Sequence, residues 1–193
     1  MHIYALLGSP RTAGNTRTLL DIVLEAAEQS GAQVELAELA KLENLTGCRE
    51  CFACQEVPDA PGCAIDDDVQ DVLSKAMTAD VLLLATPVFC WSTSWLLKCV
   101  TDRMYCMFKF GGNDVRCLLQ GRALAAVITG GGDANEGADL VEESFRRFAR
   151  YSGCDWLGAL IAAPVQSPEG IRANAELTQR AQAFGMRIAQ PGE

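Results

Sequence analysis

The chain has 193 residues, of which 49% are hydrophobic, and this fits a single domain with a sizeable core. Its formal net charge of −9 argues against nucleic acid and anionic membranes as partners, because both are bound by basic faces. The apolar stretch after Met1 is too short for a secretory leader, and no apolar run approaches the length of a membrane span. We therefore expect a cytoplasmic protein whose nine cysteines are thiols or metal ligands rather than a disulfide framework.

The hydrophobic pattern alternates short apolar runs, typical of buried strands, with longer stretches that carry apolar residues on one helical face. It predicts strands at residues 3–7, 34–36, 80–86, 122–129 and 156–163. It predicts helices at residues 16–29, 69–79, 92–108, 136–151 and 168–189. Such alternation indicates a single α/β domain over residues 1–193 with a parallel, doubly wound sheet. The one irregular insertion covers about residues 46–65.

Ligands of such a sheet lie beyond the carboxyl ends of its strands, so the loops there form the candidate site. The first of these loops, residues 8–16, reads GSPRTAGNT and combines short polar side chains with a helix N-terminus, which suits a monophosphate. Arg11 or Arg17 would add a charge-assisted hydrogen bond to the phosphate. The alternative is a capped turn that only satisfies the N–H groups of the helix.

Two further loops follow the most buried predicted strands. Residues 86–94 contain Phe89 and Trp91, which offer flat surfaces to an aromatic ring or else fill the core. Residues 129–133 read TGGGD, where backbone without side chains allows close approach of a planar ligand or forms a flexible turn. The three loops together predict a site for a phosphorylated planar cofactor.

The segments GSPRTAGNT, TPVFCWSTSWLLKCVTDR and TGGG, in this order, resemble the NADPH-dependent FMN reductase-like members of the flavodoxin superfamily. The resemblance covers nearly the whole chain. It implies a flavodoxin-like three-layer sandwich with a five-stranded parallel sheet of order 2-1-3-4-5, and FMN as cofactor. It also implies a homodimer or homotetramer.

The resemblance assigns a part of FMN to each loop: the phosphate to the first, the ring to the second and a closing contact to the third. The implied residues are Ser9, Arg11, Asn15 and Thr16 for the phosphate, Pro87, Val88, Phe89, Cys90, Trp91 and Ser92 for the ring, and Thr129, Gly131 and Gly132 for the third contact. Phe89 stands where the family commonly has tyrosine, so a phenolic hydroxyl is missing there.

Four cysteines of the insertion, Cys48, Cys51, Cys54 and Cys63, are separated by two, two and eight residues. Thiolates at short spacing can surround one metal centre, and a fourth from a longer loop can close it. The segment resembles the iron–sulfur flavoproteins, which implies a [4Fe–4S] cluster near FMN. Unmetallated thiols, a reversible disulfide and a zinc ion bound by the same thiolates are the alternatives.

Charged residues near the insertion bear on its chemistry. Acidic residues, among them Glu50, Glu56 and Asp59, are expected to lower the reduction potential of a cluster by repelling added negative charge. Asp102 and Arg103 are adjacent on a predicted helix, so we expect an ion pair with other partners or a subunit contact rather than catalysis.

Three functions are compatible with these features. The first is an FMN protein that transfers electrons between a reduced donor, ferredoxin or NAD(P)H, and a [4Fe–4S] cluster. The second is an NAD(P)H-dependent FMN or quinone oxidoreductase without a cluster, and the third is a flavodoxin-like regulatory module with redox-active thiols. In the first two, FMN carries the chemistry, so no catalytic side chain is expected of the protein.

Overall fold

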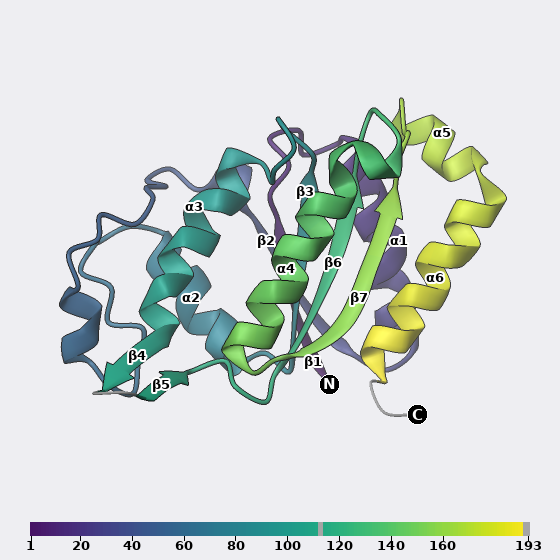
Figure 1. Cartoon of the computed structure of the whole chain (residues 1–193). Helices are drawn as coiled ribbons and strands as arrows, with labels where there is room; N and C mark the ends of the chain where they lie inside the picture. Colours follow the sequence, from purple (N-terminus) through teal and green to yellow (C-terminus); the bar gives the residue numbers. More distant parts are fainter. Residues whose placement is uncertain (112–113, 191–193) are drawn as a thin grey trace.

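The computed structural model describes residues 1–111 and 114–190. Five parallel strands form one sheet in the order β2-β1-β3-β6-β7, which is the predicted order 2-1-3-4-5 of the parallel strands (Figure 1). The predicted flavodoxin-like fold class is confirmed. The strands are β1 (His2–Leu7), β2 (Gln33–Glu38), β3 (Val81–Pro87), β6 (Ala123–Thr129) and β7 (Asp155–Ala162).

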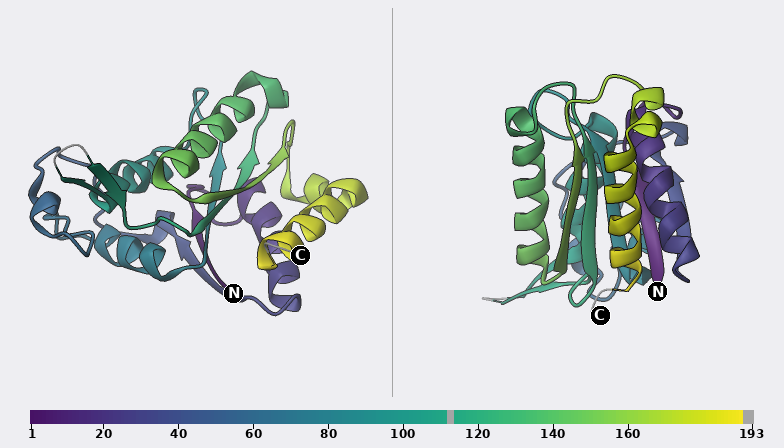
Figure 2. Two further views of the ribbon diagram at one scale, coloured as in Figure 1. Left: turned by 60° about the horizontal axis from the view of Figure 1, so that its bottom comes forward. Right: turned by 90° about the vertical axis from the view of Figure 1, so that its right-hand side faces the viewer.

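Helices cover both faces of this sheet and complete the three layers (Figure 2). One face is covered by α1 (Asn15–Gln29), α5 (Pro168–Ala173) and α6 (Ala175–Ala189). The other is covered by α2 (Val69–Thr78), α3 (Trp95–Arg103) and α4 (Asp139–Ser152). In the two described ranges, no helix is long and apolar enough to cross a bilayer.

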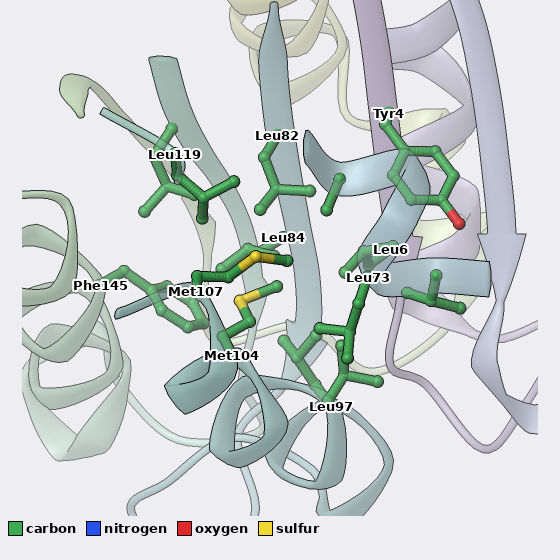
Figure 3. Close-up of a cluster of buried hydrophobic side chains, with 14 of the residues drawn as sticks. Tyr4, Leu6, Leu73, Leu82, Leu84, Leu97, Met104, Met107, Leu119 and Phe145 are labelled. Carbon is green, nitrogen blue, oxygen red and sulfur yellow. The ribbon is translucent and has the colours of Figure 1, made fainter. Parts of the chain in front are cut away.

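Alternate residues of each central strand enter one of two apolar cores. Tyr4 and Leu6 of β1 and Leu82 and Leu84 of β3 pack beneath α2, α3 and α4 (Figure 3). Their neighbours, including Leu83, pack on the opposite side against α1 and α6. Because both faces are buried, these strands appear in the sequence as continuous apolar runs rather than as an alternating pattern.

The helix predicted at residues 92–108 is wrong at both ends. Helix α3 begins at Trp95, because the Oγ of Ser94 accepts a hydrogen bond from the Leu97 N–H (3.2 Å) and caps it. After Arg103 the chain forms a 3-10 turn, η3 (Met104–Met107), and then an antiparallel hairpin. The hairpin strands are β4 (Phe108–Gly111) and β5 (Asp114–Cys117), and neither was predicted.

Two other predicted helices are interrupted. The helix at 168–189 is two helices, because Asn174 has extended backbone and its side chain accepts from the Leu177 N–H (3.0 Å) to cap α6. The helix at 136–151 begins later, at Asp139, after the irregular helical turn η4 (Ala134–Ala138). Gly137 has a φ of 132° inside that turn and breaks its continuity with α4. Two short 3-10 turns, η1 (Leu39–Lys41) and η2 (Ala53–Glu56), lie between β2 and α2.

Candidate functional site

The first loop is fixed against the end of β3 and the start of α3. The Gly8 N–H donates to the Ala85 carbonyl (2.8 Å), and the Ser94 hydroxyl donates to the Gly8 carbonyl. A Cβ on Gly8 would lie 2.6 Å from the Cβ of Leu97, so only glycine fits there. A hydrogen bond of 2.7 Å between the hydroxyls of Thr16 and Thr129 joins the same loop to the end of β6.

The small hollow between these loops, about 170 Å³, has the chemistry of a phosphate site. Gly14, the N-cap of α1, offers no side-chain cap, which leaves N–H groups of the first turn for an anion. Ser9 is buried, and its Oγ accepts from the Arg11 N–H (3.2 Å) in a local turn. The Nδ2 of Asn15 donates to the Val165 carbonyl (3.4 Å). This donor-rich lining fits the phosphate of FMN.

The structure distinguishes the two arginines of this region. Arg11 is exposed and lines the small hollow. Arg17 instead donates from Nε to Asp21 (2.6 Å) and pairs with Glu38 (3.2 Å), and the hydrogen bond to Asp21 raises its pKa. Arg11 is therefore the arginine placed to reach a bound phosphate.

The second loop forms a tight turn with unusual backbone. Phe89 and Ser92 exchange two backbone hydrogen bonds, of 2.9 and 3.0 Å. The residues between them, Cys90 and Trp91, have φ values of 48° and 59°, as in a type I′ turn, although neither is glycine. Left-handed backbone at two non-glycine residues costs energy and is concentrated at functional sites. The turn holds the Trp91 side chain 68% exposed to solvent.

A larger hollow of about 710 Å³ adjoins the small one, since Val88, Gly130 and Gly131 line both. This volume lies in the range of small-molecule sites. Its wall includes the turn of Trp91 and the loop from Gly130 to Glu136, whose carboxylate accepts from the Asp133 N–H (3.0 Å). The two hollows together form one cleft with a phosphate-sized end and a ring-sized end.

Every residue that the resemblance implied for FMN lines one of these hollows except Ser92, which closes the tight turn. Pro87, Phe89 and Thr129, which were implied for the ring and the third contact, line the small hollow rather than the large one. Residues not predicted also line the hollows: Pro10, Gly130, Asp133, Asn135, Glu136, Ala138, Val165 and Gln166. Val165 and Gln166 follow β7, and the rule that ligands lie beyond strand ends points to them as well.

The cysteine segment lies away from this cleft, beside α3 and the β4–β5 hairpin (Figure 1). Cys54 is buried and Cys63 is half-buried, whereas Cys48 and Cys51 are exposed. Gln55 connects the segment to the hairpin: its Nε2 donates to the Phe108 carbonyl (3.0 Å), and its Oε1 accepts from the Phe110 N–H (3.1 Å).

Three of the four sulfur atoms in this segment accept a hydrogen bond. Cys48 accepts from the Glu50 N–H (3.4 Å), Cys54 from the Gln55 Nε2 (3.4 Å) and Cys63 from the Arg103 Nε (3.1 Å). Such donors tune iron–sulfur clusters, so the ligand chemistry fits one. Within residues 1–111 and 114–190, however, no group of three or more His, Cys, Asp or Glu side chains is assembled to hold a metal ion.

Arg103 is the most deeply buried charged residue of this region. Its side chain forms the expected ion pair, which is with Asp67: Nη1 and Nη2 donate to the two carboxylate oxygens at 2.7 and 3.0 Å. Burial alone would raise the pKa of Asp67, but the hydrogen bonds and charge of Arg103 hold it below its ordinary value. The remaining N–H groups of Arg103 bind the Thr46 and Ile65 carbonyls.

A flavodoxin-like sheet binds its ligands in a cleft at the carboxyl ends of its strands, as flavodoxin binds FMN. The sequence matches the NADPH-dependent FMN reductase family over residues 1–161. The chain therefore belongs to that family.

Curated relatives include iron–sulfur flavoproteins of two archaea. The protein of Methanocaldococcus jannaschii is 37% identical over 103 residues, which cover 53% of this chain and 51% of the relative. That of Methanosarcina thermophila is 26% identical over 153 residues, which cover 79% of this chain and 75% of the relative. The chain thus spans about half the length of the first relative and three quarters of the second.

Solved structures confirm the fold. RosB, solved with a bound intermediate, aligns with a TM-score of 0.74 at 16% identity and covers 98% of this chain and 79% of RosB. The NAD(P)H:quinone oxidoreductase of Methanothermobacter marburgensis aligns with a TM-score of 0.70 at 18% identity. This alignment covers 97% of this chain and 98% of the oxidoreductase chain.

Proposed function

We propose that this chain is an electron-transfer flavoprotein of the iron–sulfur flavoprotein type, which holds FMN in the strand-end cleft and a [4Fe–4S] cluster on Cys48, Cys51, Cys54 and Cys63. The observation that carries the FMN part is the continuity of the two hollows through Val88, Gly130 and Gly131. One end of this cleft offers anion donors, and the other offers the Trp91 ring, Val88 and the backbone of the glycines at 130–132, as a phosphorylated ring requires.

The residues of the chain bind and orient FMN in this proposal. Ser9, Asn15, Thr16 and the N-terminus of α1 hold the phosphate, with Arg11 as a charged partner. The segment 87–91 and the glycines at 131 and 132 hold the ring. When bound, FMN supplies both hydride and single-electron chemistry, so the protein needs no acid or base of its own.

The printed names of the curated relatives support the cluster, as do the four thiols and the three hydrogen bonds to their sulfur atoms. The proposed donor is a reduced ferredoxin or NAD(P)H, and the proposed assembly is a cytoplasmic homodimer or homotetramer. In this assembly, the cysteine segment of one subunit would approach the FMN of another, so that cluster and FMN exchange single electrons.

Two observations favour a second candidate, an NAD(P)H-dependent quinone oxidoreductase without a cluster. The large hollow of about 710 Å³ is open enough to admit a second ring against FMN, and the described cysteines are not drawn together as metal ligands. In that case the cysteines would be thiols and the acceptor a small molecule.

Anaerobic purification followed by FMN, iron and sulfide analysis tests both candidates. The proposal predicts about one FMN, about four iron atoms and about four sulfides per chain. Cys54→Ser should lose iron and keep FMN, whereas the control Cys99→Ser should keep both. FMN without iron or sulfide would leave only the second candidate, and a protein that does not bind FMN would overturn both.

A further inference from the structure

Two cations and one carboxylate are buried beneath the cysteine segment. Arg103 of α3 is 1% exposed and Lys109 of β4 is 8% exposed. Asp67, whose side chain is 3% exposed, is engaged by Arg103 through both oxygens. In the described part of the chain, the Lys109 ammonium forms no salt bridge; it donates to the Cys54 carbonyl (2.8 Å) and the Pro61 carbonyl (3.2 Å).

Among the described residues, one positive charge in this buried site therefore has no counter-charge. A buried charge is costly unless an opposite charge or several hydrogen bonds compensate it. Both cations contact the cysteine segment at its two less exposed cysteines: Arg103 binds the sulfur of the half-buried Cys63, and Lys109 binds the carbonyl of the buried Cys54. A negative group on these two cysteines would supply the missing charge.

Lys109 also folds the long gap of the cysteine motif. The carbonyls that it binds belong to Cys54, directly before the eight-residue stretch, and to Pro61, two residues before Cys63. By joining these carbonyls, the ammonium shortens the path between the third and fourth cysteines. Arg103 then fixes the side chain of Cys63 from the opposite element, α3.

We propose that Arg103 and Lys109 are positioning residues that close the cysteine motif, and that Lys109 balances the negative charge of the iron–sulfur cluster on its buried side. This inference rests on the proposed function. The charge of Arg103 is already paired with Asp67, whereas the ammonium of Lys109 opposes the effect of the acidic residues around the exposed cysteines, because nearby positive charge favours the more negative, reduced cluster. Lys109 therefore raises the reduction potential of the cluster, and both residues slow the loss of its iron.

Three variants of the anaerobically purified holoprotein test these roles. Lys109→Met keeps the apolar stem and removes both the charge and the hydrogen bonds. Lys109→Gln removes the charge but keeps a donor for the carbonyls. Arg103→Lys keeps the charge and loses the planar fork. Lys98→Met on α3 is the control, because its charge is half exposed and pairs with Asp102 at the surface.

The readouts are the cluster's reduction potential and the rate of iron loss to a chelator. We expect Lys109→Met to change the ratio of oxidised to reduced cluster about tenfold at a fixed potential, a downward shift of about 59 mV for one electron. It should also lose iron about tenfold faster. Lys109→Gln should show the same shift in potential with slower iron loss than Lys109→Met, which a purely structural role would not produce. Arg103→Lys should speed iron loss, with a smaller shift in reduction potential than Lys109→Met.

Unchanged potential and iron retention in both Lys109 variants would overturn the inference. FMN content and circular dichroism establish whether each variant folds. If Lys109→Met does not fold, the potential and iron retention of Lys109→Gln alone test the inference. Failure of the proposed function is seen separately, as wild-type protein that contains no iron.

Discussion

The strand-end loops and the cysteine segment both leave the same edge of the sheet, yet different contacts hold them in place. Backbone hydrogen bonds and a close approach at Gly8 fix the first loop against β3 and α3. The cysteine segment follows β2 and is held largely by long polar side chains, those of Gln55, Arg103 and Lys109. The flavin cleft is thus built by the fold itself, whereas the cysteine segment depends on a few buried side chains.

The largest effect is expected where the cysteine segment depends on its buried ion pair. Asp67→Ala leaves the guanidinium of Arg103 buried without its carboxylate, which should lower the free energy of unfolding by about 3–5 kcal/mol. Chemical denaturation measures it, with the exposed neighbour Asp66→Ala as control at about 0.5 kcal/mol or less. A loss below about 1 kcal/mol for Asp67→Ala would show that other contacts hold the segment.

The same ion pair predicts an acid sensitivity. Because the pKa of Asp67 is lowered in the folded protein, its contribution is fully present above its unfolded pKa, near about 4. That contribution is lost as the pH falls through the folded pKa. Between pH 7 and pH 3, the wild type should lose more stability than Asp67→Asn, and parallel curves for the two proteins would contradict this.

In the strand-end cleft, the loss of a single side chain should have a smaller effect on FMN binding, because backbone groups form much of the site. Thr16→Ala removes one buried hydroxyl from the small hollow and should weaken FMN binding about tenfold, the effect of one charge-assisted hydrogen bond. Quenching of FMN fluorescence measures the affinity. Thr16→Ser should restore it, and the exposed Thr12→Ala should match the wild type. Equal FMN affinity for the wild type and all three variants would show that the phosphate of FMN does not bind at Thr16.

A substitution in the strained turn of Cys90 and Trp91 should have a smaller effect, and it should raise the stability of the protein rather than lower it. Cys90→Gly relieves a left-handed φ of 48° and should stabilise the FMN-free protein by about 1 kcal/mol. Ser92, two residues further on, has no such φ, so Ser92→Gly should instead destabilise the protein by about 0.5–1 kcal/mol. Thermal unfolding compares them, and loss of stability in both would mean that the turn stores no strain.

The smallest effect concerns small-molecule acceptors. Asp133 and Glu136 line the large hollow, and no lysine or arginine of the described residues lines it with them. Anionic acceptors should therefore react more slowly than neutral ones. Glu136→Gln should raise kcat/KM for a sulfonated naphthoquinone a few-fold relative to the unsubstituted quinone, and salt should reduce the difference. Glu28 is exposed on α1, so Glu28→Gln should leave the ratio of the two kcat/KM values unchanged. The same ratio in Glu136→Gln and Glu28→Gln would contradict the role of Glu136.

The sheet and its cleft could be predicted because local patterns determine them. Uninterrupted apolar runs such as Val81–Ala85 indicate strands buried on both faces, and parallel strands place their following loops at one edge. The hydroxyls of Thr16 and Thr129 meet for this reason. Only Ser92 among the implied FMN residues lies outside the hollows, because the turn that contains it could not be deduced from its neighbours.

The environment of the cysteines could not be predicted in the same way. The hairpin of β4 and β5 was taken for the end of a helix, although the alternation of Phe108, Lys109 and Phe110 indicates a strand. Its partner Gln55 lies far earlier in the chain, and no local pattern pairs them. The contact of Arg103 with Cys63 is equally non-local.

A count of the electrons accepted per chain tests the central claim most directly. Wild-type protein, purified and titrated anaerobically with a strong reductant, should accept about three electrons, two at FMN and one at the cluster. Cys54→Ser should accept about two. A wild type that accepts about two electrons, with the same absorbance changes as Cys54→Ser, would contradict the account of the cysteine segment.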